Sequence, residues 1–314
     1  MKTILRPRAV LLLAGFLAIC FSACAVKTTP VPKPPTGLRA GLRSSPYGPK
    51  NGFPNPAYWQ SSARSMASRF TGAIPALVWI VGTMESDEAI EPEDRFTGRC
   101  KLSFPSPGGE FPDIVFSDAD ANEAYLEQFD RNGYQVWLQV EPANADVETL
   151  IKLVLDRYGK HSCVIGFGID VEWHRWSRQN NEGTEVSDIQ ARAWSERVRK
   201  YDPGYRLFLK HWLDSKMPAS YRQGLAFISD SQEFTSLEQM LADFEAWGKA
   251  FAPVPVGFQF GYPFDGAWWR QLADPPAAIG RAILARIPNT SELYWVDFTM
   301  QEIWPEAAAA PEKN

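Results

Sequence analysis

HSCVIGFGIDVEW, residues 161–173, is the stretch that decides the fold. Its apolar run, residues 163–169, is continuous rather than alternating, which is typical of a strand buried on both faces of a parallel sheet. Two acids follow the run, Asp170 and Glu172. Residues two apart on a strand share a face and lie roughly 6 to 7 Å apart along the chain. We therefore expect both carboxylates to point into one pocket.

Seven other runs resemble this strand, and helical patterns separate most of them. The eight runs lie at residues 76–81, 112–117, 135–140, 163–171, 206–212, 225–229, 255–260 and 293–298. Asn55 and Ser236 are typical helix caps, and Gly133 and Gly159 are typical helix ends. Eight strands with room for crossovers predict an α/β fold, a single (β/α)8 TIM barrel. A doubly wound sheet is the alternative, but no glycine-rich phosphate fingerprint follows the first run.

Two segments fall outside this alternation. Residues 86–110 show no helical pattern, so we expect a long loop over one mouth of the barrel. Residues 24–50 are rich in Pro, Gly, Thr and Ser, which predicts an extended tether. The barrel domain is then expected at residues 51–314.

The first 23 residues have the pattern of a signal peptide, with a basic start, a short apolar run and a small-residue ending. The ending Ser22-Ala23-Cys24 resembles a bacterial lipobox, so Cys24 is the expected lipidation site. This predicts a lipid-anchored protein of the bacterial cell envelope, and ordinary cleaved secretion is the alternative. No later segment has the roughly 18 uninterrupted apolar residues of a membrane-spanning helix.

Composition narrows the class of partner. The formal net charge is −5, which disfavours nucleic acid as a partner because phosphate binding needs clustered Lys and Arg. Twelve Trp against three His suit a surface that stacks on flat apolar faces better than they suit a metal site. Apart from Cys20 and Cys24, the chain has Cys100 and Cys163. They could form a disulfide in an oxidising compartment or remain two separate buried thiols.

In a TIM barrel, the active site lies at the C-terminal ends of the strands. Acids and aromatic residues dominate these positions here, as they do in sites that bind sugars and cleave glycosidic bonds. Asp170 and Glu172 are the catalytic candidates, because two acids on one strand face repel each other unless they are paired or used. Candidate substrate-binding residues are Glu141, Trp173, Lys210, Trp212, Asp230, Gln259, Tyr262, Trp295 and Asp297. Structural roles stay open for two of them: Glu141 could pair with Lys210 or an arginine, and Asp230 could brace a loop.

Residues 165–172, IGFGIDVE, resemble the fourth-strand motif of glycoside hydrolase family 18, the chitinase-like barrels, which reads Asp-Gly-Phe/Ile-Asp-Ile-Asp-Trp-Glu. The two sequences agree at Gly166, Phe167, Ile169, Asp170 and Glu172, and differ at the first two motif acids, where Ile165 and Gly168 stand. The resemblance implies that Glu172 is the general acid and that Asp170 orients an acetamido group of the substrate. It also implies pocket roles for Tyr262 and Trp295. The Ser-x-Gly-Gly signature of that family's third strand is absent from the sequence.

The chain also resembles retaining glycosidases that have catalytic glutamates on strands four and seven. Its seventh predicted strand has Gln259 at the position of the nucleophile. Asp170, Glu141, Asp230 or Asp297 would then supply the second group. The leading hypothesis is a glycoside hydrolase acting on a polysaccharide or cell-wall glycan by carboxylate acid–base catalysis. The alternatives are a non-catalytic glycan-binding or envelope-scaffold barrel, and a metal-dependent hydrolase or deacetylase. We expect no cofactor, no bound metal and a monomer.

Overall fold

The computed structural model describes residues 37–86 and 96–305, which belong to one compact unit. The expected signal peptide, Cys24 and the first part of the expected tether lie outside the described residues. No helix within the described ranges is long and apolar enough to cross a membrane.

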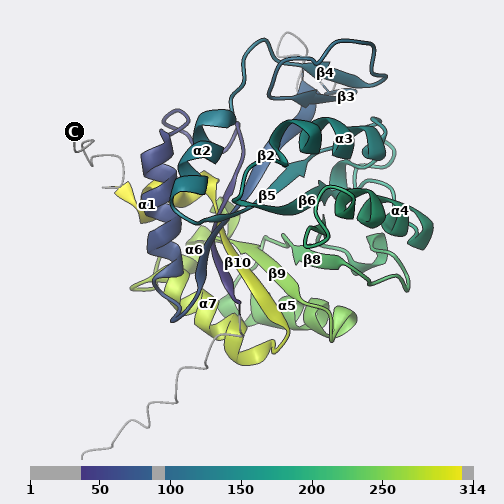
Figure 1. Ribbon diagram of the computed structural model, residues 1–314. Helices are drawn as coiled ribbons and strands as arrows, with labels where there is room; N and C mark the ends of the chain where they lie inside the picture. Colours follow the sequence, from purple (N-terminus) through teal and green to yellow (C-terminus); the bar gives the residue numbers. More distant parts are fainter. Residues whose placement is uncertain (1–36, 87–95, 306–314) are drawn as a thin grey trace, which may run out of the picture. The chain divides into compact units, whose positions relative to one another are not determined.

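Eight parallel strands close into a barrel, which confirms the predicted (β/α)8 fold (Figure 1). The order around the barrel is β1 (Arg39–Ser44), β2 (Ile74–Ser86), β5 (Gln135–Val140), β6 (Val164–Asp170), β7 (Arg206–Lys210), β8 (Leu225–Ser229), β9 (Val256–Phe260) and β10 (Thr290–Val296). Pairing of β1 with both β10 and β2 closes the ring.

Two of the sequence-based strand assignments were wrong, and the two errors compensate. Strand β1 lies within residues 24–50, which we had assigned to the tether, so the barrel begins before residue 51. The run at 112–117 is not a barrel strand: it contains β4 (Ile114–Phe116), which pairs with β3 (Phe96–Leu102). One barrel strand was missed and one was added, so β6 is still the fourth.

The segment expected to be a loop after the first predicted strand is partly a sheet extension. β2 is 13 residues long, and its last part pairs antiparallel with β3. Figure 1 shows β3 and β4 beside the outer end of β2, beyond the barrel. An alternating pattern of exposed and buried residues in β3 agrees with a sheet that has one face in solvent.

Helices surround the strands (Figure 1). They are α1 (Pro56–Ala67), α2 (Glu123–Arg131), α3 (Val147–Tyr158), α4 (Asp188–Arg199), α5 (Leu237–Phe251), α6 (Gly266–Trp269), α7 (Pro275–Arg286) and α8 (Met300–Ile303). Two starts follow the expected capping chemistry: Asn55 accepts from the backbone N–H of Tyr58, and Ser236 accepts from the backbone N–H of Gln239. Between β7 and β8 the chain forms only a 3-10 turn, Asp214–Lys216.

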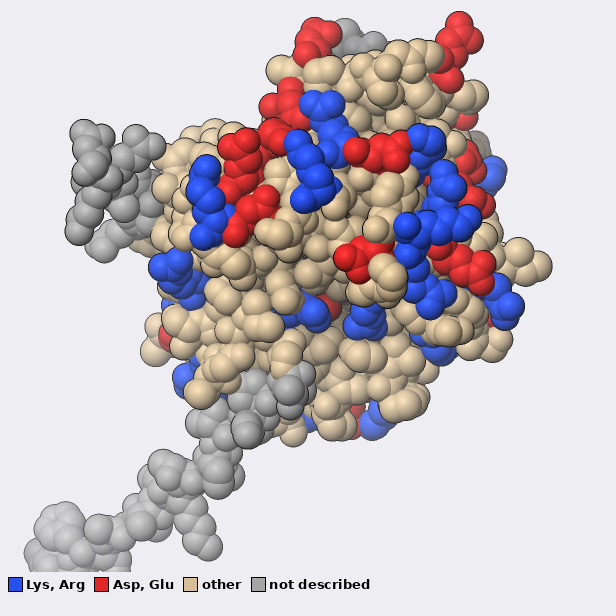
Figure 2. Space-filling view, viewed as in Figure 1, with Lys and Arg blue, Asp and Glu red and all other residues tan. Residues whose placement is uncertain are grey.

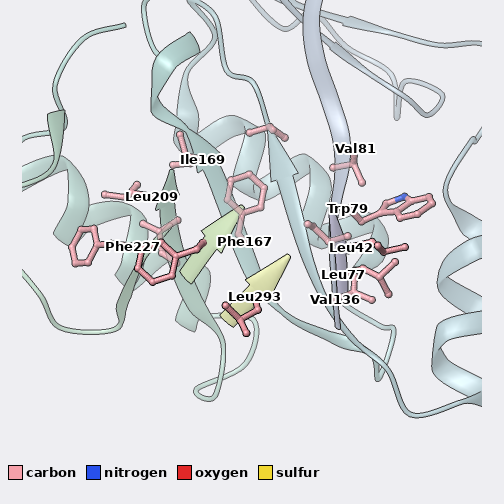
Figure 3. Close-up of a cluster of buried hydrophobic side chains, with 14 of the residues drawn as sticks. Leu42, Leu77, Trp79, Val81, Val136, Phe167, Ile169, Leu209, Phe227 and Leu293 are labelled. Carbon is pink, nitrogen blue, oxygen red and sulfur yellow. The ribbon is translucent and has the colours of Figure 1, made fainter. Parts of the chain in front are cut away.

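The strands separate an outer core from the barrel interior by simple alternation. In β2, Leu77, Trp79 and Val81 belong to the large cluster that packs under the helices, part of which Figure 3 shows. Their neighbours Ala76 and Val78 belong to a small separate cluster together with Trp137, Phe208, Ala226, Ile228 and Tyr294. Because side chains alternate between faces of a strand, this small cluster fills the barrel interior.

Two glycines of β6 give the interior aromatic rings their space. A Cβ on Gly166 would lie 2.5 Å from the Trp137 ring, and one on Gly168 would lie 2.0 Å from the Phe208 ring. Both distances are far below van der Waals contact. The acid that the family 18 motif has at position 168 therefore has no room here, because Phe208 occupies its place.

Surface charges are mixed in sign. Figure 2 shows a face on which Lys and Arg side chains lie next to Asp and Glu side chains, without a large basic patch. Cys100 and Cys163 are both buried free thiols, so the disulfide that the sequence left open is not formed.

Replacing Gly168 with alanine is expected to destabilise the fold by about 1–3 kcal/mol, because the added methyl overlaps the Phe208 ring. Chemical denaturation would measure the loss. Phe208→Leu should relieve the overlap, so the double variant should lose less stability than the two single losses together. Additive losses would contradict the proposed contact.

Candidate active site

Asp170 and Glu172 reach the same place by a route that the sequence did not predict. Asp170 is the last residue of β6, and Glu172 lies in the following 3-10 turn, Val171–Trp173, not on a continuing strand. Oxygens of both carboxyls nevertheless lie within 4.8 Å of each other and of an oxygen of Asp230, which follows β8. Three carboxyls from two strand ends therefore meet at the C-terminal mouth.

Lys210 joins two of these carboxyls. It is the last residue of β7 and stands beside Asp170 in the β6–β7 register. Its ammonium lies 2.8 Å from Asp170 Oδ2 and also donates to Asp230 Oδ2. All three side chains are buried. Glu141, for which pairing with Lys210 was one of the open structural roles, is bonded instead to Tyr47 and to the backbone of Met84.

Burial and charge shift the pKa values of Glu172, Asp170 and Lys210 in different ways. Burial raises the pKa of Glu172 to about 9, and the negative charge of Asp170 adds to this effect. Burial also raises the pKa of Asp170, but the Lys210 ammonium opposes the shift. Burial alone would lower the pKa of Lys210, whereas Asp170 and Asp230 together raise it well above its usual value. At neutral pH, Glu172 therefore carries a proton and Lys210 is charged.

Several polar atoms at the mouth have no hydrogen-bond partner among the described residues. They are Asp170 Oδ1, Asp230 Oδ1, Gln139 Oε1 and Gln259 Nε2. Gln139 also donates to Asp170 Oδ2 at 3.4 Å, and Gln259 accepts from Tyr262 at 3.3 Å. Buried polar groups are rarely left unpaired, so these atoms are suited to a polar ligand.

Strand β1 adds a second network, which sequence reasoning missed because it assigned this segment to the tether. Arg43 donates to Asp297 Oδ1 at 3.1 Å and to the Tyr47 hydroxyl at 3.0 Å. Tyr47 in turn donates to Glu141 Oε1, and the backbone N–H of Met84 donates to the other oxygen at 3.0 Å. The available signal for this strand was the alternation of apolar residues at 38, 40 and 42 with Arg or Gly at 39, 41 and 43.

This network changes the roles expected for two predicted residues. Both oxygens of Asp297 are used inside the protein, one by Arg43 and the other by Ser45. The carboxylate therefore anchors the end of β1 instead of facing substrate. Both oxygens of Glu141 are also bonded, although this residue still lines a pocket.

Two surface pockets open at the mouth. The first, which we call the β7–β8 pocket, has a volume of about 330 Å³ and is lined by Glu172, Trp212, Asp230, Ser231, Gln232 and Glu233. The second, which we call the β1–β5 pocket, has a volume of about 460 Å³ and is lined by Pro46, Tyr47, Thr83, Met84, Ser86, Phe96, Lys101, Glu141 and Trp173. Trp173 and Trp212 thus lie where substrate-binding residues were expected.

Trp295 does not belong to the site. It is fully buried, donates to Thr299 at 2.9 Å and packs edge-on against Trp269. Leu293, two residues earlier, faces the same outer core, so alternation along β10 points Trp295 toward the helices. The stacking role expected for Trp295 was wrong. Tyr262 is nearly buried and contacts the site through Gln259.

The three carboxyls could also offer one oxygen each to a cation. Their oxygens lie within 4.8 Å of one another, and carboxylate oxygens are the ligands that hard divalent ions prefer. However, the Lys210 ammonium already contacts two of these carboxyls, and its charge opposes a second cation there. The donor set therefore suits a site that holds protons better than one that holds a metal.

Comparisons with known proteins add little to this geometry. No family model and no curated protein matches the chain. Among solved structures, a putative α-L-fucosidase from Bacteroides thetaiotaomicron has 12% identity and a TM-score of 0.42, with coverage of 91% of this chain and 97% of that chain. An intracellular xylanase from Thermoanaerobacterium saccharolyticum has 11% identity and a TM-score of 0.42, with coverage of 83% and 86%.

An FMN-binding β-glucuronidase from Facaelibacterium prausnitzii has 12% identity and a TM-score of 0.40, with coverage of 58% of this chain and 31% of that one. This chain thus spans about a third of the glucuronidase. At these identities and TM-scores the likenesses carry no argument about activity. The function has to be inferred from the site itself.

The raised pKa of Glu172 predicts a pH-dependent effect on stability. A carboxyl whose pKa is higher in the folded than in the unfolded state binds its proton more tightly when folded. Folding stability therefore falls as the pH rises from the unfolded value, 4.5, toward about 9. Glu172→Gln removes this loss, so the variant should gain stability relative to the native protein between about pH 5 and about pH 8.

Denaturant midpoints at the two pH values would measure this gain. Glu196→Gln, at an exposed position of α4, is the matched control and should show no such trend. An equal trend in both variants would contradict the assignment of a raised pKa to Glu172.

Proposed function

We propose that this protein is a glycoside hydrolase acting on a polysaccharide or cell-wall glycan, with Glu172 as the proton donor. One observation carries the proposal: Glu172 and Asp230 line the same pocket. Burial raises the pKa of the partly exposed Glu172 to about 9, whereas Lys210 pairs with the buried Asp230. Glycosidic cleavage needs this pair, an acid that protonates the leaving oxygen and a carboxylate that supports the positive sugar centre.

Asp230 is the better candidate for the second carboxyl. It lines the β7–β8 pocket together with Glu172, and its Oδ1 has no partner among the described residues. Asp170 is more deeply buried and acts through its neighbours: it positions Lys210 and raises the pKa of Glu172. Glu172 would give its proton to the leaving oxygen and then accept one from the water that completes hydrolysis.

The spacing of the carboxyls favours retention over inversion of the anomeric centre. Retaining enzymes hold the two carboxyls about 5 to 5.5 Å apart, whereas inverting enzymes leave about 6.5 to 9.5 Å for a water molecule. Oxygens of Glu172 and Asp230 lie within 4.8 Å.

The family 18 mechanism has less support than the broader glycosidase proposal. Phe208 fills the space of the motif acid at position 168, and Lys210 holds one of the two Asp170 oxygens. These two features also favour the alternative, a glycan-binding barrel without catalysis. Measurements of binding and of turnover on the same glycans separate the two functions.

Attachment to the bacterial cell envelope through Cys24 is part of the same proposal. Its support is the signal-peptide pattern of residues 1–23 and the Ser22-Ala23-Cys24 ending. A cell-wall glycan would be within reach of an enzyme anchored there.

Glu172→Gln is expected to lower hydrolysis by about 10²- to 10⁴-fold, because the amide cannot protonate the leaving oxygen. Reducing-end release from chitin, peptidoglycan, xylan and mixed-linkage β-glucan would measure it. Glu196→Gln should keep the native rate. Equal activity of Glu172→Gln and the native protein would disprove the assignment, and binding without turnover by the native protein would support the non-catalytic alternative.

Activity is expected to fall as the pH rises through about 9, where the Glu172 carboxyl loses its proton. Asp170→Asn removes the neighbouring negative charge that helps to raise this pKa, so the alkaline limb of the pH–rate profile should move to lower pH. Profiles of kcat/KM for the two proteins on one substrate would measure the shift. An alkaline limb that stays in place would show that another group sets it.

A further inference from the structure

The two pockets at the mouth lie in different sectors of the barrel rim. The β1–β5 pocket is formed at the ends of β1, β2, β5 and β6, and the β7–β8 pocket at the ends of β6, β7 and β8. In the closed strand order, the end of β6 separates the two sectors. Consecutive residues of this turn face the two sides, since Trp173 lines the first pocket and Glu172 lines the second.

We propose that the two pockets form one cleft for an internal stretch of a glycan chain, with sugar units bound on both sides of Glu172. The inference rests on the proposed function and deepens it, because it makes the substrate a chain cut internally instead of a terminal unit. Each pocket alone reaches the lower part of the range typical of small-ligand sites, roughly 300 to 1,000 Å³.

The β1–β5 pocket is built for binding instead of reaction. Its acid, Glu141, has both oxygens bonded inside the protein. Burial raises the pKa of Glu141, while its hydrogen bond from Tyr47 opposes the shift. Tyr47 is about half exposed and carries its ring at the pocket wall. Because Glu141 is already bonded and the wall is aromatic, the pocket can bind a sugar unit next to Glu172 without taking part in bond cleavage.

The sheet extension supplies the second aromatic wall. Phe96 of β3 lies 5.6 Å from the Trp173 ring, and Trp176 lies 5.9 Å from the same ring. This packing holds Trp173 in place at the pocket edge, and a fixed aromatic face is what stacking on a sugar ring requires. Trp212 provides the corresponding ring in the β7–β8 pocket.

The test measures binding in Glu172→Gln, which should remove turnover. Isothermal titration would use chito-, xylo-, cello- and peptidoglycan-derived oligosaccharides of two and of six sugar units. A cleft that spans both pockets should bind the six-unit chain of the recognised glycan about tenfold more tightly than the two-unit chain. Equal affinity for both lengths, or no binding of any oligosaccharide, would overturn the inference.

A substitution that fills the β1–β5 pocket makes the test specific. Thr83→Trp, added to Glu172→Gln, places a large ring in the β1–β5 pocket and should abolish the gain from chain length while two-unit binding persists. Thr97→Trp adds the same ring at an exposed position of β3 outside the pocket lining and should keep the gain. A gain that survives Thr83→Trp would overturn the inference.

Phe96→Ala removes a ring from the wall of the β1–β5 pocket and should also reduce the gain in affinity with chain length. This variant replaces Thr83→Trp as the test if Thr83→Trp does not fold. The native protein then separates this inference from the proposed function. A length-dependent gain together with internal cutting of the six-unit chain supports both. The same gain in affinity without cutting would support the cleft and contradict the hydrolase function. Release of terminal units only would overturn the inference that the chain is cut internally.

Discussion

The Lys210 ammonium between Asp170 and Asp230 is the interaction on which the site depends. Breaking a buried ion pair by removing one partner costs about 3–5 kcal/mol, because the remaining charge stays buried and unpaired. Here one cation holds two carboxylates from neighbouring strands, so it fixes the ends of β6, β7 and β8 relative to one another. Glu172 retains its proton because burial and the negative charge of Asp170 raise its pKa more than the Lys210 charge lowers it.

Closure of the barrel by β1 supports the other half of the mouth. Arg43 links the start of the domain to Asp297 at its end, and Tyr47 extends the same network to Glu141. The strand that closes the ring thus also builds the wall of the β1–β5 pocket. Fold and candidate binding surface share these residues, so a change in one would be expected to affect the other.

Much of the fold was predictable because local patterns carry it. The apolar runs identified seven of the eight barrel strands, and Asn55 and Ser236 marked helix starts as expected. Strand β1 was missed because its surroundings are rich in Pro and Gly, which mask a short alternating strand. Residues 112–117 were misassigned because a local apolar run does not say which strand it pairs with.

The sequence by itself determined the barrel and the presence of acids at the strand ends, because residue periodicity and turn chemistry are local properties. Only the tertiary structure decided which acids meet. Asp230 joins Asp170 and Glu172, whereas Asp297 is held by Arg43 and Trp295 turns toward the helices. The tertiary structure also decided that Phe208 takes the space above Gly168. Distances between residues far apart in the chain depend on packing, which no local pattern encodes.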